Sequence, residues 1–488
     1  MKPCPPSPRH RPVLRWTWLG FGAAALSGCA NLSPTTDPAL PAINVPPAWS
    51  AGPAVTAAAV DPAALARWWQ RFGDAALTTL VSQALQANPS VKSAQAALLQ
   101  ARALADVQRA GLGPTLGVSA SAQRSQSGQQ GASHRYQAGF DASWEPDIFS
   151  GNRNAAQASL ADAQASAAGL ANVQVSLAAE VAVGFINLRG LQARLAIARS
   201  NLATQVETAQ IARWRAQAGL ASSLDVEQAV TAAEQTQAQI PALETSVLQA
   251  LHGLAVLSGQ APGALHAALG EIAPIPPAPA DLALAFPADT LRQRPDVRAA
   301  ERRINAAQAR VAVADAARYP SLRLSGSLGL SALTLGSLTG GAAALNSLLA
   351  SVSAPLFDAG ANQAQLRAQQ AALEQARLAY AAVVLGALQD MEDALVALRG
   401  DRERLVHLQA ASQAAANAEL LARQRYSSGL IDFATVLSTQ RNLLAAQDSV
   451  ASTQASLSAD HVRLYKALGG GWRPEAESPA ALPLAARP

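Results

Sequence analysis

The sequence predicts a mainly α-helical protein with a small β part, built from two tandem copies of one helix–β-hairpin–helix unit. Three observations support this fold class. About 115 of the 488 residues are alanine, which has the highest helix propensity of the amino acids. Two stretches of about 65 residues keep helical periodicity throughout. Before each of them lie two short segments whose polar and apolar residues alternate, which is the period of a β-strand.

The first 28 residues have the layout of a secretory signal peptide. Three arginines between residues 9 and 15 precede an apolar run from 16 to 26, which is too short to span a bilayer as a helix. The run ends in Leu-Ser-Gly-Cys at 26–29, which resembles a bacterial lipobox. We therefore expect residues 1–28 to be removed and Cys29 to carry an N-acyl and an S-diacylglycerol group. No aspartate follows Cys29 to indicate retention in the inner membrane.

The positive net charge lies in the segment that is removed. Lys2 and the three arginines are its only charges, and the rest of the chain has 33 basic and 33 acidic residues. The mature chain is therefore neutral, and its charge gives no indication of nucleic-acid binding. Cys4 is the only other cysteine, so the mature protein has no pair of thiols for a disulfide. Residues 29–60 are rich in proline, alanine and threonine and are expected to form a lipidated tether.

An internal repeat organises the rest of the chain. Residues 111–121 match 317–327 at an offset of 206, and residues 218–226 match 428–436 at an offset of 210. A drift of only four residues over this length indicates a tandem duplication. Around the two repeats we expect a signal peptide, a tether, a proline-rich linker (the equatorial segment of the family described below) and a flexible tail. The order along the chain is 1–28 signal, 29–60 tether, 61–270 first repeat, 271–288 linker, 289–470 second repeat and 471–488 tail.

Each repeat contains the same elements in the same order. A helix of about 25 residues stops before a proline, Pro114 or Pro320, because the proline ring prevents continuation. Two strands, a very long helix, a glycine turn at Gly219 or Gly429 and a final helix follow. The expected helices are 89–112, 295–318, 152–217 and 361–426, and the final helices end near Gly259 and Gly469.

The four expected strands have one apolar face and one small or polar face. In 135–145, Tyr136, Phe140 and Trp144 share the apolar face, and in 321–331 leucines oppose serines. The partner strands, 115–125 and 346–356, alternate less regularly. This pattern is typical of a membrane β-barrel with a polar lumen, and a soluble half-buried hairpin shows the same pattern over so few residues.

The two long helices carry a coiled-coil seam. Each corresponds to about 95–100 Å of helix at 1.5 Å per residue, far more than a globular helix. Apolar residues step by four and three along both, so we expect these helices to pack along their length against others. The seams are Leu177, Val181, Gly184, Leu188, Leu191, Leu195, Ala198 and Leu202, and Val384, Leu388, Met391, Leu395 and Leu398. After the signal peptide no run of 18 consecutive apolar residues occurs, so no transmembrane helix is expected.

Four strands cannot form a closed barrel by themselves. Lipid offers no partner for unpaired backbone groups, so an open sheet cannot span a membrane. Small barrels need about eight strands. If the strands enter a membrane, several chains must share one barrel, which has eight strands from two chains or twelve from three.

The duplicated units, the lipobox and four motifs resemble those of the TolC-like outer-membrane efflux factors, in particular the NodT-like RND efflux outer-membrane lipoprotein family. The motifs are RPDVRAAE (294–301), PLFDAG (355–360), AGLASSLDV (218–226) and SGLIDFATVL (428–437). The resemblance implies a homotrimer with one shared 12-stranded outer-membrane β-barrel, continuous with a long periplasmic α-helical barrel. It also implies an exit duct of a tripartite RND-type efflux system, which passively conducts drugs or other small substrates. The implied partners are a periplasmic adaptor (membrane fusion) protein, an inner-membrane RND pump and outer-membrane lipid.

The resemblance also implies roles for particular residues. The helix tips Gly219, Leu220, Ala221, Ser222, Gly429, Leu430 and Ile431 are expected to contact the adaptor, although a helix-to-helix turn alone explains the glycines. Family members often carry aspartates just after the second tip, where this chain has Thr435 and Ser438. Asp225 and Asp432 remain as candidates for a periplasmic gate, and helix capping explains them equally well. Tyr136 and Trp144 are expected at the membrane interfaces.

The sequence contains no constellation that indicates catalysis, a metal site or a cofactor. The six histidines are scattered, and no nucleotide-binding or nucleophile motif occurs. We therefore expect a protein that is not an enzyme, located in the bacterial outer membrane with a large periplasmic extension. The competing interpretation is a periplasmic coiled-coil structural lipoprotein, which leaves the two amphipathic hairpins unexplained.

Overall fold

The computed structural model describes residues 40–41, 43–47, 49–50, 65–126, 128, 131–279, 291–340 and 343–473. The chain divides into two compact units, each made of segments that are distant in sequence. We call them the strand unit and the helical unit. The strand unit includes Arg102–Asp162 and Ile304–Ala376, and the helical unit includes Pro41–Ala101, Ala163–Arg303 and Arg377–Pro488.

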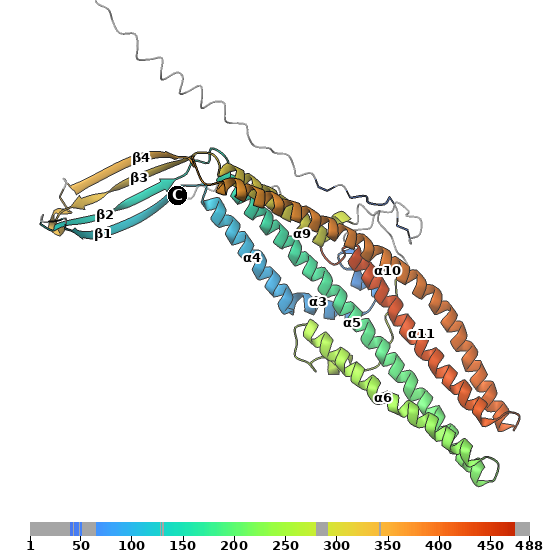
Figure 1. The fold of residues 1–488 in the computed structure, drawn as a ribbon. Coiled ribbons are helices and arrows are strands. Elements are labelled where there is room, and N and C mark those ends of the chain that lie inside the picture. Colours follow the sequence, from blue (N-terminus) through green and yellow to red (C-terminus); the bar gives the residue numbers. More distant parts are fainter. Residues whose placement is uncertain are drawn as a thin grey trace, which may run out of the picture. The chain divides into compact units, whose positions relative to one another are not determined.

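A four-stranded antiparallel sheet dominates the strand unit (Figure 1). Its strands are β1 (Thr115–Ser125), β2 (Ser133–Trp144), β3 (Ser321–Ala332) and β4 (Ala344–Ser353), in the order β1-β2-β3-β4. The sequence predicted all four strands; β4 begins two residues earlier than expected and ends at Ser353, before Pro355, whose missing N–H cannot continue a ladder. A short 3-10 helix, η2 (Leu335–Ser337), follows β3.

The helices repeat with the register that the sequence predicted. The pairs at an offset of 210 are α5 (Gly151–Gln217) with α10 (Ala361–Ser427), and α6 (Ser223–Leu257) with α11 (Phe433–Ala467). The shorter helices α4 (Pro89–Ala110) and α9 (Pro295–Ala316) match at 206. In the helical unit, α5 turns back into α6 and α10 into α11, so that each repeat ends in a long helical hairpin (Figure 1). The unit also contains η1 (Trp68–Phe72), α3 (Ala75–Ala87) and α7 (His266–Leu269).

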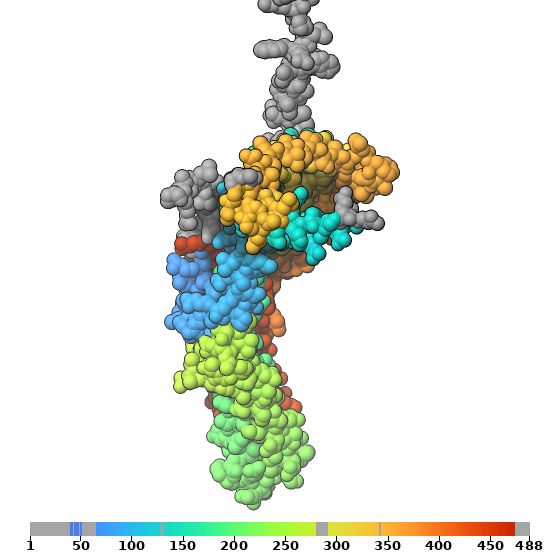
Figure 2. Space-filling view, turned by 90° about the vertical axis from the view of Figure 1, so that its left-hand side faces the viewer, coloured from blue at the N-terminus to red at the C-terminus, as the bar shows by residue number. Residues whose placement is uncertain are grey.

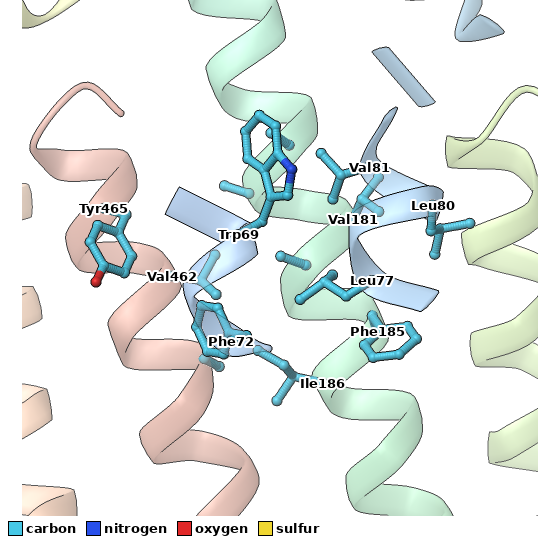
Figure 3. Close-up of a cluster of buried hydrophobic side chains, with 14 of the residues drawn as sticks. Trp69, Phe72, Leu77, Leu80, Val81, Val181, Phe185, Ile186, Val462 and Tyr465 are labelled. Atoms are coloured by element: carbon cyan, nitrogen blue, oxygen red, sulfur yellow. The ribbon is translucent and has the colours of Figure 1, made fainter. Parts of the chain in front are cut away.

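The main hydrophobic core lies where η1 and α3 pack against α5 and α11 (Figure 3). Trp68 is fully buried, and its ring stacks on Tyr465 with 5.4 Å between centroids. Figure 3 places Phe185 beside Leu77 and Ile186 beside Phe72. In this stretch α5 is therefore buried on more than one side, whereas the sequence predicted a single seam. Among the predicted seam residues, those that the structure buries are Leu177, Val181, Leu188, Leu195, Ala198, Val384, Met391, Leu395 and Leu398.

A hydrogen bond at equivalent positions joins the two ends of each repeat. The Asn88 side chain, just before α4, donates from Nδ2 to the carbonyl of Leu257 at 2.8 Å. At the matching position of the second repeat, Arg294 donates from Nη1 to the carbonyl of Ala467 at 3.2 Å. Both bonds satisfy a carbonyl in the last turn of a helix, where the helix itself supplies no donor. Sequence-distant ends of each repeat are thus fastened together.

Arg294 opens the RPDVRAAE motif and carries two further partners. Its Nη2 atom lies 2.7 Å from Asp296 Oδ2 and 3.0 Å from Asp390 Oδ2. Burial lowers the pKa of Arg294, but the hydrogen bonds and charges of the two aspartates outweigh it and raise the pKa above its ordinary value. The motif therefore supplies a buried arginine, paired with a partly exposed and an exposed aspartate, that connects α9, α10 and α11.

Two helices, α5 and α6, are long and apolar enough to cross a membrane by length and composition alone. The sequence predicted no such helix because polar residues interrupt every long apolar run. In the most apolar window, 50% of α5 and 28% of α6 are buried inside the protein. Core packing accounts for the hydrophobicity of α5, because Phe185, Ile186 and their neighbours form the main core.

Several predicted segments lie outside the described residues. These are the signal peptide 1–28, Cys29, most of the tether, the linker from 280 to 288 and the tail from 474 onward. The described part of the tether is packed: Trp49 is buried, and Ser50 donates two hydrogen bonds to the Glu392 carboxylate at 2.7 and 2.8 Å. Trp49 and Ser50 thus belong to the helical unit.

Candidate functional site

The strand register places most apolar side chains on one face of the sheet and most small or polar side chains on the other. Residues that lie opposite each other share a face, as in Val118 with Phe140 and Phe140 with Leu328. The apolar face consists mostly of Ala, Leu, Val and aromatic residues, and much of it is exposed: Leu116, Val118, Leu348 and Val352 are 73%, 79%, 85% and 72% exposed. This exposed apolar face requires a nonpolar environment or a partner to cover it.

The opposite face of the sheet is polar and nearly uncharged. About half of its residues are serine, as the pairs Ser325–Ser143 and Ser327–Ser347 illustrate, and β4 adds two leucines, Leu345 and Leu349. Asp141 is one of its few charges, and its carboxylate accepts a hydrogen bond from Ser119 at 2.5 Å. This face therefore suits contact with water.

Tyr136 and Trp144 lie on the apolar face at opposite ends of β2. Eight residues of extended strand separate them, which corresponds to about 27 Å. Trp144 is 40% exposed, and its indole N–H donates to the carbonyl of Leu112 at 3.1 Å. A barrel strand tilted by about 35–45° covers roughly 20 Å of membrane height over that length. The location of both aromatic residues at the membrane interfaces stays a prediction.

A pair of glycines lies where the two β-hairpins meet. Gly139 and Gly329 lie opposite each other at the β2–β3 junction. A Cβ atom on Gly329 would lie 2.5 Å from the carbonyl oxygen of Ala138, which is too close for any side chain. Glycine at both positions thus permits the tight junction between the hairpins.

At the other end of the repeats, each helical hairpin turns through a glycine with positive φ. Gly219 and Gly429 have φ of 73° and 72°. The next residue donates back to the preceding helix: Leu220 N–H to Arg215 at 2.7 Å and Leu430 N–H to Arg425 at 2.9 Å. This is a Schellman-type helix end. Leu220 is 69% exposed and Leu430 is 73% exposed. Figure 2 shows the α5–α6 tip, in green, uncovered on the face toward the viewer.

Both candidate gate aspartates cap helices. In the first tip, Asp225 accepts from the backbone N–H of Ser222 at 3.0 Å, while the Asp225 N–H donates to the Ser222 hydroxyl at 3.2 Å. In the second tip, Asp432 is itself the N-cap and accepts from the backbone N–H of Thr435 at 2.9 Å. Hydrogen bonds from the Thr435 side chain and backbone lower the pKa of Asp432. Asp225 and Asp432 thus occupy the two different positions of one capping arrangement.

Contacts between the two helical hairpins were not predicted from the sequence. Arg215 at the end of α5 donates to the carbonyl of Tyr426 at 3.1 Å, and its guanidinium lies 4.5 Å from the centre of the Tyr426 ring. Burial raises the pKa of Tyr426, the charge of Arg215 lowers it and the charge of Asp225 raises it. Phe433 packs beside Tyr426 with 5.2 Å between ring centroids.

Further along α5, three polar pairs continue this line, and we call all four the cross-hairpin contacts. They are Thr208–Gln440 at 2.9 Å, Asn201–Gln447 at 2.9 Å and the ion pair Arg194–Asp448 at 2.7 Å, together with Arg215–Tyr426. Each joins α5 of the first repeat to α10 or α11 of the second. No local motif marks these residues, because the contacts depend on which helix faces meet.

Within the described part of the chain, no group of three or more His, Cys, Asp or Glu side chains is arranged to hold a metal ion. The features that stand out are instead a two-faced sheet and two helix tips joined by polar contacts.

Known proteins share this architecture. The family described as outer membrane efflux protein matches residues 80–260 and 286–470. The toluene efflux pump outer membrane protein TtgF of Pseudomonas putida is 30% identical over 472 residues, 92% of this chain and 95% of that protein. The pyoverdine export outer membrane protein OpmQ of Pseudomonas aeruginosa is 32% identical over 427 residues, 85% and 89% of the two chains. The solved structure of the outer-membrane channel OprN superposes with a TM-score of 0.83 at 35% identity, covering 89% of this chain and all of that one.

Proposed function

The chain belongs to the outer membrane efflux protein family, and from this membership we propose that three copies share one 12-stranded barrel that forms the exit duct of an RND-type tripartite pump. The protein is an outer-membrane channel of an efflux system and not an enzyme. Family membership and the two-faced sheet both oppose the interpretation as a structural coiled-coil lipoprotein.

The observation that carries the trimer proposal is the open sheet with its exposed apolar face. Its edge strands, β1 and β4, pair with no further strand among the described residues. In a membrane those edges must be paired, because lipid supplies no hydrogen-bonding partner. Three four-stranded sheets joined edge to edge close a ring of twelve strands, with the apolar faces toward lipid and the serine-rich faces toward a water-filled lumen.

The long helical hairpins would line the duct on the periplasmic side. The exposed tip residues Leu220 and Leu430, with their neighbours in the two turns, would meet a periplasmic adaptor protein. Asp225 and Asp432 would stand near the constriction as capped acids, and the cross-hairpin contacts would hold it closed. We infer that the contact nearest the tips, Arg215–Tyr426, breaks when the tips separate to let a solute pass.

Energy and substrate choice would come from the partners. The chain has no nucleotide-binding motif, so an inner-membrane RND pump, connected by the adaptor, would drive export. Two relatives of similar identity carry names for different substrates, toluene for TtgF and pyoverdine for OpmQ. The duct therefore imposes little selection, and its cargo is the set of drugs or other small molecules that its pump delivers. Lipid on Cys29 would anchor the N-terminus in the outer membrane.

The mass of the unheated oligomer tests this proposal. We would recover the full chain from the outer-membrane fraction in mild detergent and measure its mass by light scattering corrected for detergent. Three chains per particle are expected, together with increased drug susceptibility of a deletion strain. A single chain per particle would contradict the shared barrel.

A further inference from the structure

The β2–β3 pairing inside the chain is a template for the pairing of edge strands between neighbouring copies. Thr115 and Ser321 each follow the proline that ends a helix, and each starts the first strand of a hairpin. They pair with Ser143 and Ser353 respectively. First strands therefore correspond at an offset of 206 and second strands at 210, the same offset that relates α5 to α10.

Within the chain, the second strand of one hairpin pairs with the first strand of the next, with Asp141 opposite Ser327. The equivalent strands that lack a partner are β4, the second strand of the second hairpin, and β1, the first strand of the first. Adding 210 to 141 gives Ser351, and subtracting 206 from 327 gives Ser121. We propose that β4 of one copy pairs antiparallel with β1 of the next copy, with Ser351 directly opposite Ser121. This inference rests on the proposed trimer and defines its interface.

The proposed register keeps the two faces of the sheet continuous. It sets Val352 opposite Ala120 on the apolar face and Ser353 opposite Ser119 on the polar face. A slip of one residue would place serines among the apolar side chains, because side chains alternate along a strand. The alternatives that preserve the faces therefore differ from the proposed register by two residues.

Two exposed apolar side chains lie at the base of the same junction. Leu356 and Phe357 follow β4 and are 97% and 92% exposed. At the base of the internal junction, the link after β2 instead covers the corner before β3, where Phe149 stacks on Tyr319 with 4.9 Å between centroids. The corner before β1 has Gly113 where the corner before β3 has Tyr319. The link after β4 has Ala359 where the link after β2 has Phe149, so the exposed Phe357, two residues earlier on that link, is the ring available to fill this space in the next copy.

The internal junction also differs from the proposed one at the middle of the strands. Gly139 and Gly329, whose backbones touch, correspond to Leu349 and Gln123, which carry side chains. The neighbouring copies therefore share the register of the internal junction but lie farther apart at this pair.

Paired cysteines test the register. The natural cysteines are only Cys4 and Cys29, so engineered thiols can be followed in the full chain. Directly opposite residues have Cβ atoms about 4.5–5.5 Å apart, close to the roughly 3.5–4.5 Å between the Cβ atoms of a disulfide. Diagonal neighbours have Cα atoms about 7–8 Å apart, beyond the roughly 4.4–6.8 Å between the Cα atoms of a disulfide. We would compare S121C/S351C with the matched pair S119C/S351C, oxidise outer-membrane preparations and separate the chains under denaturing, non-reducing conditions.

S121C/S351C is expected to give covalent dimers and trimers in at least fivefold greater yield than S119C/S351C. Preferential linkage of S119C/S351C, or trimers in which neither pair forms, would overturn the proposed register while leaving the trimer intact. The mass of the unheated, unoxidised particle distinguishes this result from failure of the trimer itself, which would appear as a single chain.

A second variant tests the base of the junction. Phe357→Ala is expected to lower the temperature at which detergent-solubilised trimers dissociate by at least 5 °C, while Phe357→Leu restores most of the loss. The control is Leu335→Ala, another apolar side chain, 71% exposed, in the loop between β3 and β4. Equal losses for Phe357→Ala and Leu335→Ala would overturn the role of Phe357 between copies.

Discussion

At the scale of single residues, His461 of α11 is a histidine held inside the protein. Its side chain is only 1% exposed. Burial and the positive charges of Arg402 and Arg71 lower its pKa from 6.5 to about 4. In the unfolded chain the same residue takes up its proton near pH 6.5. The folded and unfolded states therefore bind different numbers of protons between about pH 6.5 and pH 4.

The contribution of His461 to stability is expected to be complete above pH 6.5 and to be lost as the pH falls toward 4. In that window the unfolded state binds the additional proton, so acid favours unfolding. At about 1.4 kcal/mol per pKa unit, the loss amounts to at most about 3.5 kcal/mol. Thermal unfolding of purified protein between pH 7.5 and pH 4 should show a shallower pH dependence for His461→Gln than for the exposed control His407→Gln. Identical slopes would contradict this account.

Gly469 and Gly429 share a φ of 72° but differ in their surroundings. A Cβ atom on Gly469 would lie 3.1 Å from the Cα of Arg294, whereas one on Gly429 would meet nothing within 4 Å. Gly429→Ala is expected to cost about 1–2 kcal/mol for the left-handed backbone alone. Gly469→Ala adds a steric term of about 1–3 kcal/mol. Denaturant unfolding of the two variants measures the difference, and equal losses would show that the α9 end moves aside freely.

At the scale of elements, β3 offers adjacent residues on opposite faces of the sheet. Leu328 lies on the apolar face and Ser327 on the polar face. An arginine facing lipid near the bilayer midplane costs about 2–4 kcal/mol, and one facing a water-filled lumen costs little. Leu328→Arg should therefore sharply reduce the amount of trimer in the outer membrane, while Ser327→Arg leaves it near normal. The opposite ranking would mean that the serine face contacts lipid.

The cross-hairpin contacts lead to a prediction about the closed tip. Arg215→Ala removes both the hydrogen bond and the cation–π contact to Tyr426, which should increase the population of open tips. Purified protein in planar bilayers is expected to show several-fold more frequent open-channel events. Arg213→Ala, two residues earlier on the same helix and exposed, serves as the matched control. Unchanged gating in Arg215→Ala would show that this contact does not hold the tips together.

The helices and strands could be predicted from the sequence because local signals define where they begin and end. Pro114 and Pro320 end helices, Gly219 and Gly429 turn them, and alternation marks the strands, so the expected bounds fall within a few residues of the observed ones. The cross-hairpin contacts escaped prediction because Arg215 and Tyr426 are 211 residues apart and no local pattern relates them. For Asp225 and Asp432 the sequence indicated capping as well as a gate, and the structure has both aspartates capping helices. Their role in a gate stays a prediction.

At the scale of the whole molecule, two kinds of membrane attachment are expected in one chain. Three acyl chains on Cys29 would each add about 0.8 kcal/mol per buried CH₂ group, and the strands would add a closed barrel. Cys29 precedes the described helices and strands, so the lipid can be removed without altering them. The barrel alone should suffice to keep the protein in the membrane, because extracting it would expose the whole apolar face of the sheet to water.

Cys29→Ser, exported behind a cleavable signal peptide of a non-lipidated protein, separates the two attachments. We expect it to lose labelling by radioactive palmitate completely while it remains in the outer-membrane fraction as a trimer, at no less than about half of the normal amount. The unaltered chain behind its own signal is the control, and it should take up the label. If the variant instead appears as a monomer in the soluble periplasm, then lipid and not the strands holds the protein in the membrane, and the shared barrel would have to be abandoned.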